Sequence, residues 1–562
     1  MGRTGAAFLL EFLHSAGVRY LFGNPGTTEL PINEALVNAP IKYILGLHEI
    51  PVMAMADGFA QASGQLGVVN VHISCGLGNA MGMLYNAYRA GTPLLVTAGQ
   101  QDQRFIHKDP ILWGDMVAVT RPWTKWSGEV RSVRQLPQVL QRAVQIALTP
   151  PTGPVFLSLP LDVQVDLIPE DVPARCAAPP RRAVLPEETA IREAALVLLR
   201  SHSPCIVLGS KAIGDEGVSA VQQLAETLGA PVFHEPYYCH GRCHFPPIHP
   251  LSAGLLPFWA PDIRTRLAPF DVILAAGVKL FEEYLYHGDV SPIPESAKLV
   301  HIEDDPAEVN KNYPATVGLV GDIGKILGRL AALVAQEELP DPDRVRRRRE
   351  EWQTSIAAAR AKMRAEASSQ FGSRPLRALA VLETLARVLP RNVAVVEEAP
   401  TTSGSYFERV GALANPEGFF AQKGWALGWG VGCAIGVRLA WPDRPVLALL
   451  GDGAALYGIQ GLWTAAHYRI PVTFVVANNR QYGILKSCAR VLGLPHALAG
   501  QFCGLDLEPP SIDFVELARA LGVEAHRVDS EEELAEEVRK SLAGDSPALI
   551  EVPVAPSVLD TG

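Results

Sequence analysis

Basic residues are in the minority in this 562-residue sequence, which has 49 lysines and arginines against 59 aspartates and glutamates. The formal net charge of −10 repels a phosphate backbone, so we expect no nucleic-acid partner. Cysteine is also scarce. Eight cysteines are too few for a disulfide scaffold in a chain of this length, which favours a reducing compartment.

Long apolar runs are missing as well. No stretch of about 18 residues has the uninterrupted apolar character of a membrane span, and no basic and apolar leader precedes Phe8. We therefore expect no membrane association and a cytoplasmic location. Hydrophobic residues nevertheless make up 48% and charged residues 19% of the chain, which is typical of globular proteins and excludes a mainly disordered one.

Short β-rich runs alternate with helical patterns from residue 19 onward, beginning with RYLFG, KYILG and GVVNV. Such alternation predicts βαβ units and a parallel sheet with helices on both faces. The pattern starts again after a proline- and alanine-rich linker at 171–190, and a third time after a charged stretch at 337–351. The sequence thus predicts an α/β protein with three parallel-sheet domains in series, over residues 1–170, 190–335 and 365–555.

Two stretches offer ligand-type side chains but favour simpler interpretations. One holds five side chains of the kind that bind zinc within eleven positions, yet its spacing is not that of a zinc finger and prolines interrupt it, so we expect an ordinary loop. The other is an arginine run at 344–349, which acids flank on both sides, so we expect a solvated charged helix or linker. The residues of the first stretch are Cys239, His240, Cys243, His244 and His249.

The most informative motif lies in residues 446–483, where an apolar strand ends in Gly451-Asp452-Gly453 and a second apolar strand ends before Asn479. Because the carboxyl ends of parallel strands meet at one edge of a sheet, Asp452 and Asn479 are expected to lie together. Their oxygens suit Mg²⁺, and the glycines and the following helix start suit a phosphate. The motif predicts a site for magnesium and a diphosphate.

This Gly-Asp-Gly and Asn-Asn pair resembles the signature of the thiamine diphosphate-dependent decarboxylases, and the resemblance covers almost the whole chain. FGNPG at 22–26, the glutamate of LHE at 47–49, ADG at 56–58 and NAMG at 79–82 are especially similar to benzoylformate decarboxylases. The resemblance implies a pyrimidine-binding domain, a central domain and a diphosphate-binding domain, in that order. It also implies a homodimer or homotetramer with active sites between subunits.

The resemblance implies that Asp452 and Asn479 bind Mg²⁺ through their side chains and Gln481 through its backbone carbonyl. Glu49 is expected to pair with a ring nitrogen of the cofactor's aminopyrimidine, and Leu427 to support the cofactor's bent conformation. From the residues alone, Glu49 also fits a first-turn helix acid, and Leu427 fits a plain core leucine better than a cofactor contact. The implied cofactor-binding residues are Glu49, Thr401, Thr402, Leu427, Gly451, Asp452, Gly453, Asn479, Tyr482 and Gly483.

Further catalytic residues follow from the same resemblance. His72 matches the family histidine that moves protons during the reaction, although a strand-end histidine is often structural. Thr27 stands where benzoylformate decarboxylases have a serine that contacts the substrate carboxylate. The position of a second catalytic histidine is occupied by Tyr284, with His287 three residues further on. We expect Tyr284 to line the pocket as a hydrogen-bond donor, and His287 stays the alternative.

The implied activity is the thiamine diphosphate- and Mg²⁺-dependent, non-oxidative decarboxylation of a small 2-oxo acid to an aldehyde. A carboligase or lyase of the acetolactate synthase or 2-hydroxyacyl-CoA lyase kind is the enzymatic alternative, and a non-catalytic cofactor carrier is a further one. Gly76, Gly78 and Gly82 weakly suggest dinucleotide binding, but no acid follows at the required distance. Departures from the family pattern at Ile484 and Cys488 leave the substrate open, and a flavin or nucleotide in the central domain stays open too.

Overall fold

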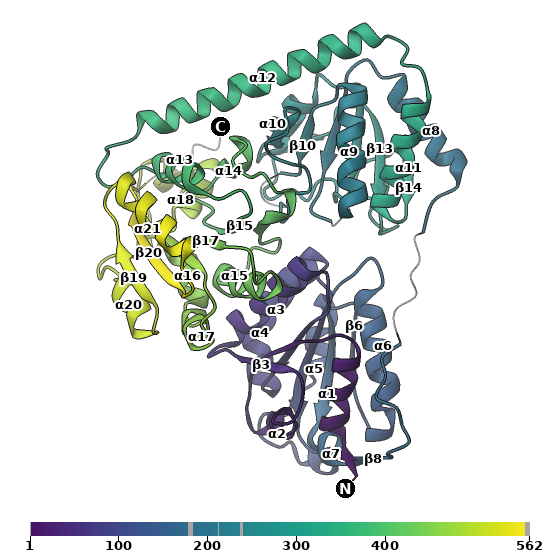
Figure 1. Ribbon diagram of the computed structural model, residues 1–562, viewed down its shortest axis with the longest axis vertical. Coiled ribbons are helices and arrows are strands. Elements are labelled where there is room, and N and C mark those ends of the chain that lie inside the picture. The colour runs from purple at the N-terminus through teal and green to yellow at the C-terminus, as the bar shows by residue number, and fades with distance from the viewer. Residues whose placement is uncertain (1, 178–183, 212, 237–239, 557–562) are drawn as a thin grey trace.

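The computed structural model describes residues 2–177, 184–211, 213–236 and 240–556, and its core consists of three six-stranded sheets (Figure 1). Every strand pair within these three sheets is parallel, whereas β1 (Arg3–Thr4) and β8 (Leu167–Ile168) form a separate antiparallel pair. The predicted fold class, three parallel-sheet α/β domains in series, is confirmed. Part of the predicted linker, 178–183, and Cys239 lie outside the described residues.

The first sheet has the strand order β3-β2-β4-β5-β7-β6 and is covered by helices on both faces. Its central strands are buried along their whole length, which explains their mostly apolar sequences. The strands are β2 (Tyr20–Asn24), β3 (Lys42–Leu45), β4 (Gly67–Val71), β5 (Leu94–Gln100), β6 (Trp126–Glu129) and β7 (Val155–Pro160). The helices are α1 (Gly5–Ser15), α2 (Leu30–Leu36), α3 (Glu49–Ser63), α4 (Ile73–Ala90), α5 (Met116–Thr120), α6 (Leu136–Leu148) and α7 (Leu161–Val165).

The central domain contains the second sheet, with the order β11-β10-β9-β12-β13-β14. Its strands are β9 (Pro204–Leu208), β10 (Val232–His234), β11 (Ser252–Leu255), β12 (Val272–Ala276), β13 (Lys298–Glu303) and β14 (Val317–Val320). Its helices are α8 (Glu188–Leu199), α9 (Gly214–Leu228), α10 (Ala260–Leu267) and α11 (Ile323–Gln336).

The third domain contains the sheet β16-β15-β17-β18-β20-β19. Its strands are β15 (Ala394–Glu398), β16 (Phe419–Ala421), β17 (Val446–Gly451), β18 (Thr473–Asn478), β19 (Glu524–Arg527) and β20 (Ala548–Pro553). Its helices are α13 (Ala378–Val388), α14 (Tyr406–Arg409), α15 (Trp429–Ala440), α16 (Asp452–Gly458), α17 (Gly461–His467), α18 (Gly483–Val491), α19 (Pro495–Leu498), α20 (Phe514–Ala520) and α21 (Glu531–Ala543).

The arginine run lies on α12 (Pro342–Ser369), a long helix that spans the central and third domains (Figure 1). The prediction of a charged helix is correct, but its arginines are not all solvated. Arg348 is buried and donates to the carbonyl oxygens of His202 and Gly229 in the central domain. Arg364 donates to both carboxylate oxygens of Glu383 in the third domain at 3.0 and 2.9 Å. These arginines attach the helix to both domains.

Helices α3 and α15 pack directly against each other and join the first domain to the third (Figure 1). Glycines make this contact possible: a Cβ added at Gly436 would lie 2.0 Å from the Met55 carbonyl oxygen, and one at Gly58 would lie 2.4 Å from the Cys433 carbonyl oxygen. The two helix backbones therefore touch without side chains between them. The indole nitrogen of Trp429 adds a buried hydrogen bond of 2.6 Å to the Asp57 carboxylate.

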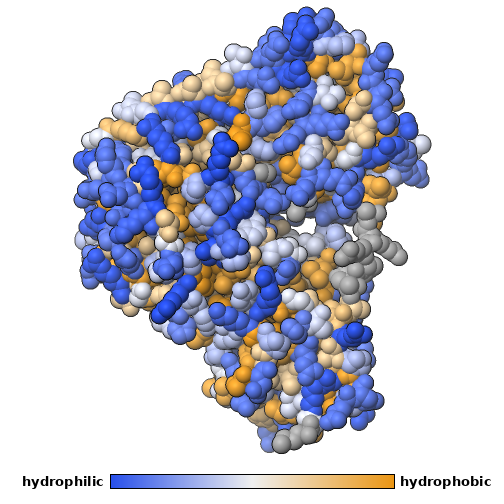
Figure 2. Space-filling model, viewed as in Figure 1, coloured by the Kyte–Doolittle hydropathy of each residue, from blue (hydrophilic) through white to orange (hydrophobic). Residues whose placement is uncertain are grey.

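The visible surface is mostly hydrophilic, with small scattered hydrophobic groups (Figure 2). Among the described residues, no helix has both the length and the apolar character needed to cross a bilayer.

We predict that Gly436→Ala destabilises the protein by roughly 1–3 kcal/mol, because the new methyl group forces α3 and α15 apart. Gly78→Ala is the matched control, since Gly78 lies in helix α4 and a Cβ added there would have no atom within 4 Å. Urea denaturation should show a lower midpoint for the first variant only. Equal midpoints for both variants would show that the helix contact tolerates a side chain.

Candidate active site

Glu49 is the first residue of α3, whose N-cap is His48: its Nδ1 accepts the Ile50 N–H at 3.1 Å. The Glu49 carboxylate is only 4% exposed and accepts one hydrogen bond on each oxygen, from the side-chain amides of Asn24 and Asn79, both at 2.9 Å. It has no cationic partner among the residues that the structure describes. A buried carboxylate held at both oxygens by neutral donors is fixed in direction and keeps lone pairs for a ligand.

The glycines that suggested dinucleotide binding lie inside α4 and not in a phosphate-binding turn. That interpretation is therefore wrong. Gly76 serves a different purpose, because a Cβ at this position would lie 2.9 Å from Oε1 of Glu49. Its lack of a side chain lets α4 approach the carboxylate closely.

His72 occupies the N-cap position of α4, and its side chain lies beside a carboxylate that sequence reasoning missed. Its Nδ1 is 2.7 Å from Oε2 of Glu29, which is completely buried. The other oxygen of Glu29 accepts the Thr28 hydroxyl and the Gly99 N–H, both at 2.8 Å. Because Nδ1 is bonded to Glu29, Nε2 is the ring nitrogen left to exchange a proton with a ligand.

The backbone around this histidine is also constrained. A Cβ at Gly26 would lie 2.1 Å from the His72 ring, so only glycine fits there. Ile73, directly after His72, has φ +30°, a strained conformation for a β-branched residue. Thr27 begins the short turn Thr27–Glu29 and is exposed, so its hydroxyl is accessible to a ligand.

Asp452 and Asn479 lie together as the sequence predicted, at the carboxyl ends of the paired strands β17 and β18. The Asp452 carboxylate accepts the Gly453 N–H at 2.8 Å and the Arg480 N–H at 2.6 Å, and the Asn479 side-chain oxygen accepts the Gln481 N–H at 3.1 Å. Burial raises the pKa of Asp452 to about 6. Among the described residues no cation pairs with this carboxylate, so the site has a buried negative charge to offer.

Other predicted cofactor-binding residues lie at the same edge of the third sheet, where strands β15, β17 and β18 end. Thr401 and Thr402 are buried in the loop after β15. Gln481 is occupied through its side chain, which accepts Lys486 Nζ at 2.7 Å. The ring of Tyr482, just before α18, packs on Gly453, where a Cβ would lie 2.6 Å from a ring carbon.

Leu427 lies in the turn that leads into α15, and Glu398 determines how that helix begins. Glu398 is 2% exposed and accepts the N–H groups of Gly428, Trp429 and Gly430 at 2.8–3.0 Å. Gly428 has φ +96°, which only glycine adopts easily. Sequence reasoning missed Glu398, because its role depends on a helix start 30 residues away.

Tyr284 extends from the central domain to the third. Its ring stacks on Trp425 with centroids 5.8 Å apart and meets Phe258 edge-on at 5.8 Å. Its hydroxyl is hydrogen-bonded with the Cys488 side chain, and partial burial raises the pKa of Tyr284 above its ordinary value. His287 instead packs on the ring of Trp259 at 4.8 Å. Of these two candidates, Tyr284 is the one beside the Leu427 turn.

Apart from Tyr284 of the central domain, the predicted residues therefore form two groups. Glu49, His72 and Thr27 belong to the first domain, whereas Asp452, Asn479 and Leu427 belong to the third. No hydrogen bond or ion pair joins the two groups in the described part of the chain.

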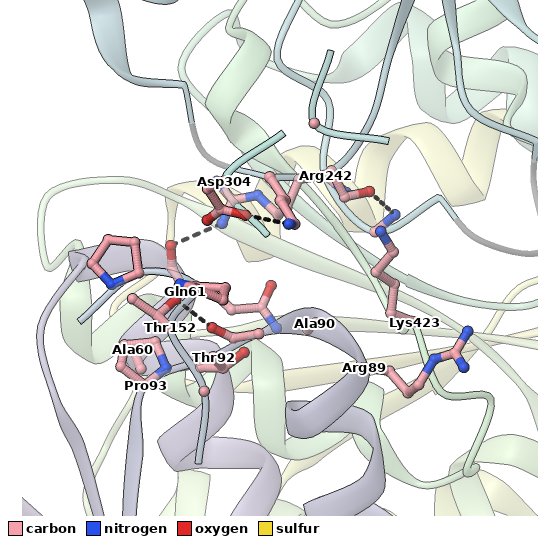
Figure 3. Close-up of a pocket in the computed structure, with 18 of the residues that line it drawn as sticks. Ala60, Gln61, Arg89, Ala90, Thr92, Pro93, Thr152, Arg242, Asp304 and Lys423 are labelled. Atoms are coloured by element: carbon pink, nitrogen blue, oxygen red, sulfur yellow. Dashed lines mark hydrogen bonds and ion pairs between the residues drawn. The ribbon is translucent and has the colours of Figure 1, made fainter. Parts of the chain in front are cut away.

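A separate cavity of about 750 Å³ lies where the three domains meet, and none of the predicted site residues lines it. Figure 3 shows Gln61 and Thr92 of the first domain opposite Arg242 and Asp304 of the central domain, with Lys423 of the third domain at one side. Asp304 forms an ion pair with Lys211, and Lys423 forms one with Glu235.

Three family models match successive parts of the chain. Residues 3–118 match the N-terminal thiamine pyrophosphate-binding domain of thiamine pyrophosphate enzymes. Residues 191–330 match the central domain of these enzymes, and residues 402–552 their C-terminal thiamine pyrophosphate-binding domain.

Individual relatives agree with these matches. A benzoylformate decarboxylase from Pseudomonas aeruginosa is 37% identical over 97% of both chains. A probable acetolactate synthase large subunit from Methanocaldococcus jannaschii is 28% identical over 98% of this chain and 92% of its own. The structure of a thiamine diphosphate-dependent 4-hydroxybenzoylformate decarboxylase from Rhodococcus jostii superposes with a TM-score of 0.86 at 31% identity, covering 99% of this chain and 100% of its own.

The Glu398 cap has a testable pH dependence. Burial outweighs its three N–H donors and raises the pKa of Glu398 to about 8. Between about pH 5 and 8 the folded protein then keeps a proton that the unfolded chain has released, so stability falls as pH rises. The quantity to measure is the free energy of unfolding of the wild type minus that of Glu398→Gln. We expect this difference to fall by on the order of 1 kcal/mol per pH unit over this range. A difference that is flat or rises over this range would mean that Glu398 is ionised in the fold.

Proposed function

This chain belongs to the thiamine pyrophosphate enzyme family, and from that premise we propose that it removes carbon dioxide from a 2-oxo acid and releases the aldehyde. The relatives named above support this activity, since the benzoylformate decarboxylase is 37% identical and the acetolactate synthase large subunit 28%. The observation that carries the proposal is the buried Glu49 carboxylate, which is held by two amides and has no cationic partner among the described residues.

The third domain fits thiamine diphosphate with Mg²⁺. The buried, unpaired carboxylate of Asp452 and the amide oxygen of Asn479 form a hard oxygen pair next to the N-terminus of α16. Asp452 and Asn479 would bind the metal with the Gln481 carbonyl, while Gly451, Gly453, Thr401 and Thr402 would face the diphosphate. When bound, the cofactor supplies the electron sink for the bond that releases carbon dioxide.

Glu49 and His72 would carry the proton transfers. Glu49 lies between two amide donors and would hold a proton on a pyrimidine ring nitrogen of the cofactor. His72 would exchange a proton through Nε2, because Glu29 fixes Nδ1. Glu29 thereby acts as a positioning residue that selects the tautomer.

The substrate would lie between the exposed hydroxyl of Thr27 and aromatic side chains. Thr27 would donate to the carboxylate of the 2-oxo acid, and Tyr284 would donate a hydrogen bond from its phenol. The stack of Tyr284 on Trp425, with Phe258 beside it, provides a flat apolar wall. We therefore propose a 2-oxo acid with an aromatic or bulky apolar side chain.

Two subunits would be needed to complete each site. The two groups of candidate residues lie on different domains without a bond between them. Apolar side chains of the first and third domains are exposed in the single chain, including Ile111 at 83% and Leu498 at 64%. These features support a homodimer, or a homotetramer built from it, with the first domain of one subunit facing the third domain of the next.

A panel of 2-oxo acids tests the activity. Purified enzyme with thiamine diphosphate and Mg²⁺ should release carbon dioxide and aldehyde in equal amounts, fastest from an aromatic 2-oxo acid. Omitting the cofactor, or Asp452→Ala, should abolish the release. A carbon–carbon bond formed between two oxo acids without free aldehyde would instead favour the carboligase alternative.

Complementation tests the shared site. Glu49→Gln and Asp452→Ala each inactivate the enzyme, but in a mixed dimer one site between subunits receives both native residues. We expect co-expression of the two variants to restore a substantial part of the wild-type activity. Sites contained within one chain would give no restoration, because every chain then carries a defect.

A further inference from the structure

The segment 422–428 connects β16 to α15 and carries Trp425 and Leu427, two of the candidate site residues. It contains no helix or strand. Trp425 in its middle has φ +61°, a left-handed conformation that is strained for so bulky a side chain. Such strain is kept only where the surrounding contacts determine the backbone. The residues that make these contacts therefore decide where the Trp425 indole lies.

Asn86 of α4 holds this segment from the first domain. Its side-chain amide donates to the Ala426 carbonyl oxygen at 2.8 Å, and its side-chain oxygen accepts the Ala426 N–H at 3.1 Å. Gly424 allows this close approach, because a Cβ added there would lie 2.4 Å from the Asn86 side-chain oxygen. Together with Glu398, which caps α15, Asn86 fixes the second half of the segment.

Lys423 holds the first half of the segment from the central domain. Its Nζ lies 3.1 and 3.4 Å from the two carboxylate oxygens of Glu235, the residue that follows β10. The two side chains are only 7% and 1% exposed. Glu235 is itself held in place, because its carboxylate also accepts the hydroxyl of Ser210 in the loop after β9. Lys423 lies at the edge of the cavity where the three domains meet (Figure 3).

The buried pair of Lys423 and Glu235 is better suited to positioning than to stabilising the fold. Both charges lose their hydration on burial, and this loss offsets most of their attraction. Separating them is nevertheless strongly unfavourable, so the pair fixes the distance between two chain segments. Trp425 lies two residues further on, and its indole stacks on Tyr284 of the central domain with ring centroids 5.8 Å apart. The ion pair and the stack hold the same short stretch against the same domain.

We propose that Lys423, through its pair with Glu235, is a positioning residue that places the Trp425 indole and thereby sets the enzyme's preference for the substrate side chain. This inference rests on the proposed function, in which Trp425 and Tyr284 form the apolar wall of the substrate site. A displaced indole removes part of that wall. An aromatic 2-oxo acid then loses apolar contact, whereas a short straight-chain one has little side chain to lose it with.

The paired change Lys423→Met with Glu235→Gln tests the proposal, because it removes both charges and leaves Ser210 an oxygen to bond. The control is Lys211→Met with Glu303→Gln, which removes another lysine of the same cavity and its buried glutamate partner. The measurement is kcat/KM for a phenyl-substituted 2-oxo acid divided by kcat/KM for a short straight-chain one. We expect the first variant to lower this ratio by roughly tenfold or more, and the control to leave it unchanged.

This ratio does not report stability, because fewer folded or cofactor-loaded molecules would lower both rate constants equally. An unchanged ratio in the variant without the Lys423–Glu235 pair would overturn the proposal. An equal fall of the ratio in the control variant would overturn it too, because the effect would then follow from the loss of any buried ion pair at this cavity.

Trp425→Ala shows whether Lys423 acts through the indole. This variant should lower the ratio by itself, and adding the paired change at Lys423 and Glu235 should lower it no further. Additive effects of the two changes would contradict the proposal, because Lys423 would then act by a route that does not include Trp425.

Amide hydrogen exchange, measured by mass spectrometry on the holoenzyme with thiamine diphosphate and Mg²⁺, does not depend on the reaction. The peptide that covers 422–428 should exchange several-fold faster in the variant without the Lys423–Glu235 pair than in the wild type, and at the wild-type rate in the control variant. Equal exchange in all three proteins would overturn the positioning role. A wild type that decarboxylates neither 2-oxo acid would contradict the proposed function, and the exchange rates would still decide whether Lys423 holds the segment.

Discussion

The rest of the molecule depends on the contact between α3 and α15, where two helices meet backbone to backbone. Gly58, Gly432 and Gly436 leave no room for a side chain at this crossing. This contact joins the first domain rigidly to the third, and these two domains carry Glu49 and Asp452. Glu49 begins one of these helices and the Leu427 turn begins the other, so the same packing fixes the starting points of both groups.

Buried acidic side chains then give these fixed positions their chemistry. Glu49 is held by amides, Glu29 by backbone and hydroxyl donors against His72, and Glu398 by the first N–H groups of α15. Each lies where water is excluded, so each has a defined direction and a defined partner. Asp452 differs, because its carboxylate accepts backbone N–H groups but has no positively charged partner in the described structure. A bound cation would balance its charge.

The sequence predicted the architecture well where local pattern decides it. Apolar strands followed by helices predicted the parallel sheets, and Gly-Asp-Gly with Asn-Asn predicted that Asp452 and Asn479 meet, as β17 and β18 confirm. The strands β6, β7, β11, β14, β16 and β19 were not predicted, and all but β7 are edge strands of three or four residues, too short to show a period. Glu29 was missed since its importance arises from His72, 43 residues away, and Glu398 for the same kind of reason. Contacts between distant segments leave no trace in a local pattern. The roles assigned to the site residues stay predictions.

The central claim is that Glu49 activates the bound cofactor by controlling a proton on its pyrimidine ring. The most direct measurement is the rate at which deuterium replaces the hydrogen on the thiazolium C2 of enzyme-bound thiamine diphosphate, followed by NMR after acid quench. Because general acid–base groups contribute roughly a hundredfold or more, Glu49→Gln should slow this exchange by at least that factor while the cofactor remains bound. Exchange at the wild-type rate in Glu49→Gln, with the cofactor fully bound, would contradict the account.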